Sequence, residues 1–379
     1  MRNWISLTLL CMLAVFVMEL PVSASAEDEV LDSYMEELNL EEIQKSIEEM
    51  FPEMSFDFRE AIGQLIRGEI PFKKEEIWNL FKTAAIQEVS SQKRIVAQII
   101  VLAVAAAVFS NFVRVFEKNQ ISDIAFYMIY LMLFVILMKA FGELDSMARE
   151  NLGHILHFMK LLLPSYLVVS SLAAGSVTAI AFYELTLFVI TGTQFLMMYV
   201  VLPGIRFYVL FLLLNHLSRE EHLSKLAELV KLALSWILKT MLALVVGIQT
   251  IQSLLLPAID ALKNSVWTKA VGAVPVLGNT LGTVTETVLG TAAVLKNAVG
   301  VAGLLVIVLL CLFPVARLAA CTLLYKLAGA AVQPVSDRRI TECISGVGEG
   351  AALLLKTVTI TGVMFLITLA MVTASMRGL

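Results

Sequence analysis

The chain has 379 residues, of which 59% are hydrophobic and only 16% are charged, and its formal net charge is −4. Soluble domains carry about 25% charged residues, so this composition excludes an ordinary soluble protein and favours an all-α, polytopic helical membrane protein. The acidic balance, which is concentrated near the N-terminus, also argues against nucleic acid as a partner, because phosphate backbones require a basic surface.

Residues 1–26 have the pattern of a secretory signal peptide. Arg2 supplies the positive charge, Trp4–Met18 form an apolar run, and Pro21 and the small residues Ala24–Ala26 are typical of a cleavage site. We expect cleavage after residue 26, and the alternative is an uncleaved first anchor. Either arrangement places the following segment outside the cytoplasm.

Residues 27–94 form a short, acidic, extracytoplasmic segment. Thirteen acidic and two basic residues lie between Glu27 and Ile62, and apolar residues return at helical spacing through Leu38–Phe51. Pro71 breaks the pattern before a third helix begins. Amphipathic helices need a surface to cover, so we expect this segment to form a small bundle of its own or to pack on the membrane or on another protein.

Residues 95–379 form a multi-span membrane domain with six to seven hydrophobic segments. The apolar runs cover Ile95–Val113, Ile121–Met138, Leu161–Tyr183, Leu187–Leu214, Leu232–Leu256, Val299–Phe313 and Ala351–Val372. The polar stretch 139–160 predicts an amphipathic helix at the membrane interface, and 325–350 is interpreted as a loop. Lysine and arginine positions fit the positive-inside tendency better when the run at 161–183 does not cross, which leaves six crossings and an external C-terminus.

The stretch 272–300 is too polar for a lipid-facing helix and too poor in charge for a soluble surface. Pro275 and Gly278 predict a break before a helix that runs through Val288 and Leu295, and the spacing of Gly278 and Gly282 permits close helix contact. We therefore expect helix packing against protein, or the lining of a wet cavity, and the alternative is a helix lying at the interface. The residues assigned to this role are Pro275, Gly278, Gly282, Thr283, Glu286, Thr287 and Gly290.

Arg206 lies inside an apolar run and is predicted to be an intramembrane charge, with Glu184 or Glu286 as its counter-charge. Lys239 and Lys356 are expected to extend to the membrane interface. The sequence carries no P-loop, nucleophile elbow, HExxH or metal-ligand spacing. We therefore expect no enzymatic activity, no cofactor and no metal.

Two long stretches carry a family resemblance. "AVPVLGNTLGTVTETVLGTAAVLKNAVGVAGLLVIVLLCLFPVARL" and "YKLAGAAVQPVSD", within Ala273–Asp337, resemble the C-terminal half of the stage III sporulation protein AE family of endospore-forming bacteria. "IRGEIPFKKEEIWNLF" and "ISDIAFYMIYLMLFVI" resemble its N-terminal half. The resemblance covers nearly the whole chain.

The resemblance implies a subunit of a channel-like or secretion-like complex in the mother-cell membrane around the forespore. Its implied partners are other membrane proteins of that sporulation complex, and we also expect a homo-oligomer embedded in the lipid bilayer. Residues 27–94 would lie between the two membranes, and the complex would support late gene expression in the forespore. The alternative function is a stand-alone permease for a small solute, because two regions of the chain are interrupted by Pro and Gly.

Overall fold

The computed structural model describes residues 40–50, 56–69, 71, 74–114, 119–174, 176–215, 223–271 and 278–375, and within these helices it leaves out the side chains of several stretches, of which 255–293 is the longest. Every element that the described residues form is a helix, as the sequence predicts. The elements are α3 (Leu40–Met50), α4 (Phe58–Ile66), α5 (Lys74–Arg114), α6 (Asn119–Ala174), α7 (Ser176–Leu196), the π-helical turn η1 (Met197–Val201), α8 (Leu202–Asn215), α9 (Ser224–Val271), α10 (Gly278–Val332) and α11 (Arg338–Ser375).

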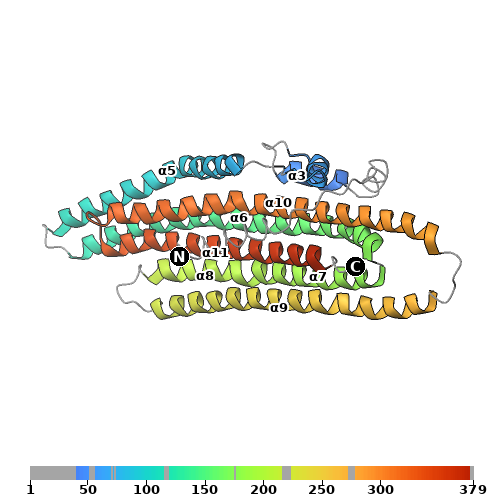
Figure 1. Cartoon of the computed structure of the whole chain (residues 1–379). Coiled ribbons are helices and arrows are strands. Elements are labelled where there is room, and N and C mark those ends of the chain that lie inside the picture. The colour runs from blue at the N-terminus through green and yellow to red at the C-terminus, as the bar shows by residue number, and fades with distance from the viewer. Residues whose placement is uncertain are drawn as a thin grey trace.

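The helices form a long, narrow bundle (Figure 1). Helices α6, α10 and α11 run side by side along its length, with α5 and α3 along one edge and α9 along the opposite edge. Helix α6 has 56 residues. At 1.5 Å per residue such a helix is about 84 Å long, well beyond the roughly 30 Å of a bilayer's hydrocarbon core.

Five helical stretches among the described residues are long and apolar enough to cross a membrane, which agrees with the expected helical membrane protein. They are Tyr127–Val168, Tyr183–Asn215, Ser224–Leu254, Val294–Val332 and Arg338–Ala374. The apolar run predicted at 95–113 belongs to α5, which begins at Lys74 and continues without a break through residues 94 and 95. The signal-peptide pattern at 1–26 lies outside the described residues.

The polar stretch 139–160 is not a separate interfacial helix, and that prediction was wrong. It is the middle of α6, continuous with the apolar runs on both sides of it. Leu144, Ala148, Leu152 and Ile155 follow one another at helical spacing, and all four are completely buried. Because the apolar face of this stretch packs into the bundle, its polar residues lie at the sides of α6 and can reach neighbouring helices.

The predicted loop at 325–350 is also wrong, because all but residues 333–337 are helical. Its glycines are contact points between helices. A Cβ atom added at Gly346 would collide with Leu212 of α8, and one added at Gly350 would collide with Val209 and Phe141. Small residues permit such close approach of helices, so a glycine-rich sequence here marks tight packing and not a loop.

Helices α3 and α4 pack along one part of the bundle. The amphipathic pattern predicted for α3 is confirmed, since Leu40, Ile43 and Ile47 are buried. They join a hydrophobic cluster that includes Phe158 of α6 and Val299 of α10. The sequence leaves open which surface these helices cover, and the structure shows that they pack on α6 and α10 of the same chain.

One glutamine holds the connection between α3 and α4. The Gln44 side chain donates from Nε2 to the Phe56 carbonyl at 2.9 Å, and its Oε1 accepts from the Phe58 N–H at 2.9 Å. Asp57 caps α4, because its carboxylate accepts from the Glu60 N–H at 2.9 Å. These contacts satisfy backbone groups that the helix ends leave without partners.

Candidate functional site: polar contacts of helix α6

The residues assigned to helix packing or cavity lining begin where α10 begins. Helix α9 ends at Val271 and α10 starts at Gly278, and α10 runs through Val288 and Leu295, where the sequence predicts a helix. Pro275 lies outside the described residues, and so do the side-chain surroundings of the other predicted residues, which are Gly278, Gly282, Thr283, Glu286, Thr287 and Gly290. Their role in packing or in lining a cavity stays a prediction.

Arg206 has a counter-charge that sequence reasoning missed. Its Nε donates to Oδ2 of Asp145 at 2.6 Å, and Nη2 contacts the same oxygen. The Asp145 side chain is completely buried, whereas 51% of the Arg206 side chain is exposed. A buried carboxylate needs a cation and hydrogen bonds, and Arg206 supplies both to Oδ2 of Asp145, whereas Oδ1 has no hydrogen-bond partner among the described residues. Neither Glu184 nor Glu286, the counter-charges expected from the sequence, is the residue found in this pair.

The π-helical turn η1 leaves a carbonyl that Arg149 reaches. In this turn bonds run to the fifth residue on, as the Leu202 N–H donates to the Met197 carbonyl. The next bond of this kind would need an N–H from Pro203, which proline lacks. Arg149 Nη1 donates to the Met198 carbonyl at 3.4 Å in its place. The Pro-Gly interruption predicted in this run is therefore a π-helical turn within a helical segment.

A second proline is compensated in the same way. Pro314 lies inside α10, and its missing N–H leaves free the carbonyl four residues earlier, that of Leu310. Asn151 Nδ2 of α6 donates to this carbonyl at 2.5 Å. Hydrocarbon supplies no hydrogen-bond donors, so a proline inside a membrane helix is tolerated where a neighbouring helix provides one.

Asp145, Arg149 and Asn151 lie within two turns of α6, and together we call them the α6 polar hub. They contact α8, η1 and α10 respectively, and their partners lie 49 to 159 positions away in the sequence. The sequence signal was present, because all three belong to the polar stretch 139–160. The pattern predicts an interfacial amphipathic helix, because periodicity alone does not reveal that polar groups can meet partners inside a bundle.

A further group of side chains ties α8, α9 and α11 together. Glu349 of α11 accepts from the Tyr208 hydroxyl at 2.7 Å and pairs with Lys231 at 2.7 Å. The Lys231 ammonium also lies 5.7 Å from the centre of the Tyr208 ring. The ion pair is nearly half exposed, so its main effect is to set the register of α9 against α11 and not to add much stability.

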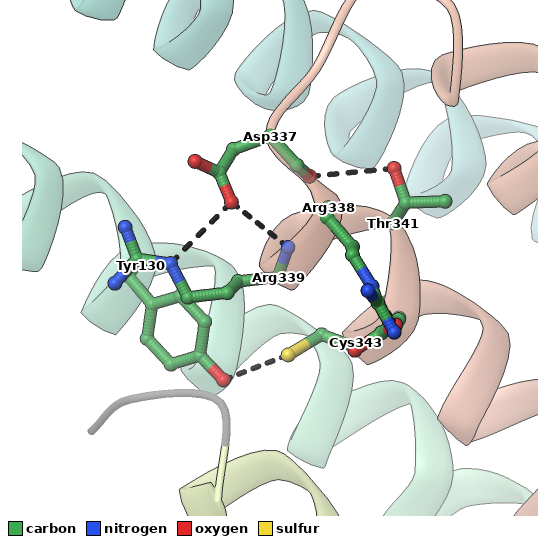
Figure 2. A network of polar contacts seen from close by, with 7 residues as sticks. Tyr130, Asp337, Arg338, Arg339, Thr341 and Cys343 are labelled. Carbon is green, nitrogen blue, oxygen red and sulfur yellow. Dashed lines mark hydrogen bonds and ion pairs between the residues drawn. The ribbon is translucent and has the colours of Figure 1, made fainter. Parts of the chain in front are cut away.

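The end of the bundle near the α10–α11 turn holds another contact between distant segments (Figure 2). The Tyr130 hydroxyl donates to the Leu213 carbonyl at 2.5 Å and lies 2.7 Å from the Cys343 sulfur. Leu213 is in the last turn of α8, where carbonyls have no intrahelical partner. Asp337 directly precedes α11, and its carboxylate accepts hydrogen bonds from the backbone N–H and the Nε of Arg339 in the first turn of that helix.

Helix α5 is also joined to α10 by polar groups. The Tyr325 hydroxyl donates to Gln92 Oε1 at 3.3 Å, and the Cys321 thiol lies 3.5 Å from Glu88 Oε1. Gln92 in turn donates to Glu88 at 3.1 Å. The cysteines among the described residues, Cys311, Cys321 and Cys343, are all buried and free.

These contacts are of a structural kind. They are ion pairs between helices, or hydrogen bonds to backbone carbonyls that lack a donor within their own helix. Among the described residues, no three His, Cys, Asp or Glu side chains gather in a way that could hold a metal ion. The α6 polar hub supplies these contacts through one atom of each carboxylate or amide, whereas Oδ1 of Asp145 and Oδ1 of Asn151 are buried without a hydrogen-bond partner among the described residues.

Comparison with known proteins places the chain in a family. The model of the family described as stage III sporulation protein AE matches residues 56–376. Among curated proteins, the chain is similar to the stage III sporulation protein AE of Bacillus subtilis (strain 168), with 21% identity over 313 residues, 82% of this chain and 78% of that protein. No solved structure matches the chain. The chain therefore belongs to the stage III sporulation protein AE family.

Proposed function

We propose that the chain is a non-enzymatic membrane subunit of a channel-like or secretion-like sporulation complex. The complex would link the mother cell and the forespore and support late gene expression in the forespore. The observation that carries the proposal is the family match over residues 56–376. Its location would be the mother-cell membrane around the forespore, with residues 27–94 on the extracytoplasmic side.

The physical character of the bundle supports a subunit that works by assembly. Its long apolar helices suit a bilayer, and the polar groups of the α6 polar hub are engaged in holding helices together. Helix α9 carries exposed large apolar residues along its length, among them Leu232, Trp236, Leu244 and Ile251. Such a surface is stable when it contacts lipid or another membrane protein, but its exposure to water is unfavourable.

The proposed partners are other membrane proteins of the same sporulation complex, further copies of this chain and the lipid bilayer. The test is to express the tagged chain in a sporulating host in place of its own relative, and to purify it in mild detergent. We expect membrane proteins encoded beside it to co-purify, and an unrelated tagged multi-span protein made at the same stage to recover none of them. A lone monomer without partners would contradict the proposal.

The permease alternative is not favoured by the described residues. A solute site needs polar groups that are free to bind solute, whereas the Arg206 guanidinium is paired with Asp145 and the Asn151 Nδ2 donates to a backbone carbonyl, so these donors are already engaged. Uptake of a small solute by the purified chain alone in liposomes, lost on substitution of Arg206, would restore this alternative. We expect no such uptake.

A further inference from the structure

Two lysines meet between α9 and α11. The contact of Lys231 with Glu349 at 2.7 Å sets the register of the two helices. Both helices are antiparallel to α10, so they run in the same direction (Figure 1). Lys239 lies eight residues beyond the first contact residue and Lys356 seven beyond the second, about 12 and 10.5 Å along the two axes. The two lysines therefore lie at one level along the seam. Seven residues return Lys356 to within about 20° of the face of Glu349, whereas eight residues place Lys239 about 80° around α9 from Lys231, where it is exposed.

Lys239 and Lys356 are two like charges at one level of the seam, and Lys356 is partly buried. Among the described residues no carboxylate lies within ion-pair distance of either one. The carboxylate closest along the seam, Glu349, is already engaged by Lys231 and the Tyr208 hydroxyl. The seam therefore carries an excess of positive charge, and repulsion between like charges is costly where water is scarce.

The surroundings of the seam are those of a membrane surface. Lys239 is exposed, and Trp236, one turn before it on α9, is 67% exposed. Leu232 and Leu244 are exposed on the same helix. Exposed tryptophan beside lysine is typical of the level at which lipid headgroups lie, and basic pockets between membrane helices bind acidic headgroups.

We propose that Lys239 and Lys356 bind the phosphate of an anionic phospholipid at the seam between α9 and α11, with the acyl chains along the exposed apolar face of α9. The phosphate supplies the negative charge that the seam lacks. The acyl chains cover the exposed leucine side chains of α9, whose contact with water is unfavourable. This site goes beyond the proposed function and does not require any other subunit.

The test measures the thermal stability of the full-length chain in mild detergent with added phosphatidylglycerol, phosphatidylcholine or inorganic phosphate. We expect phosphatidylglycerol to raise the Tm, since a ligand that binds the folded state stabilises it, and the other two to have little effect. The variant K239Q/K356Q should bind phosphatidylglycerol about 30-fold more weakly, because each lysine near a lipid surface contributes about fivefold.

A matched control removes two lysines elsewhere. Lys160 and Lys225 are exposed on α6 and α9, and K160Q/K225Q changes the net charge by the same amount. This control should keep the Tm rise, and so should K239R/K356R, which retains both charges. Without lipid, K239Q/K356Q should be at least as stable as the original chain, because it removes a repulsion.

Four outcomes would overturn the assignment. An equal loss of the lipid effect in K160Q/K225Q would show attraction by net charge alone. An unchanged lipid effect in K239Q/K356Q would place the lipid elsewhere. A Tm rise produced by inorganic phosphate alone would identify a free anion and not a lipid as the occupant. If K239Q/K356Q fails to fold without lipid, the two lysines are structural and the proposal is also wrong.

Discussion

The ion pair between Asp145 and Arg206 should respond unequally to the loss of its two members. In R206L the Asp145 carboxylate stays completely buried without its cation, whereas in D145L the guanidinium stays on a side chain that is half exposed and can turn outward. Removing one partner of a buried pair costs about 3–5 kcal/mol, and we expect R206L to fall in this range. A half-exposed cation gains little from its partner, so D145L should cost about 1 kcal/mol.

The double variant D145L/R206L should be more stable than R206L alone. It leaves no buried charge behind, and replacing both members of such a pair by apolar residues is often close to neutral. We therefore expect a coupling energy of about 2 kcal/mol or more between the two positions. This coupling energy measures how much less the loss of one partner costs when the other partner is already absent.

The assay is reversible unfolding of the purified chain in mixed micelles, titrated with a denaturing detergent and followed by tryptophan fluorescence. K225L serves as a control, because the Lys225–Glu228 pair is exposed on both sides and should contribute less than about 0.5 kcal/mol. The reasoning is refuted if D145L loses as much stability as R206L, or if the double variant is as unstable as R206L.

Three further predictions use the same unfolding assay. N151A should cost about 1–3 kcal/mol because it leaves a buried carbonyl without a donor, and the cost should shrink when Pro314 is also replaced by Ala, which restores the helical N–H; an equal cost in both backgrounds would show that the bond is unimportant. G350V should cost about 1–3 kcal/mol by overpacking, whereas G142A, with open space around it, should not destabilise; similar losses would contradict the packing described. Y130F should cost about 1–2 kcal/mol through the lost cap of α8, and an unchanged stability would exclude that role.

Much of the fold follows from local pattern. Apolar runs of about 20 residues predict membrane helices, and the spacing of Leu40, Ile43 and Ile47 predicts an amphipathic helix, as the structure bears out. The same reasoning failed at 139–160 and 325–350. Charge density and glycine content predict an interfacial helix and a loop, whereas the first segment is the middle of α6 and the second is helical except at residues 333–337.

The candidate site shows the same division. Arg206 is conspicuous in the sequence because a charge inside an apolar run is costly. Its partner, however, lies 61 positions away in a stretch that the sequence predicts to be an interfacial helix. The partner of Pro314 is harder still to anticipate. Sequence shows that proline removes an N–H, but not which donor replaces it, and Asn151 is 159 positions from the carbonyl that it meets.

What the sequence by itself determined is the class of the protein, because composition and periodicity act through the nearest few turns of chain. Its apolar runs dictate helices suited to a bilayer, and its stretches at 273–337 identify the family. The tertiary structure alone decided which polar groups meet. That Asp145 lies opposite Arg206, and that Lys239 lies level with Lys356, depends on the register and direction of helices joined by distant turns. Register is set by the packing of whole faces against one another, and no local stretch of sequence contains it.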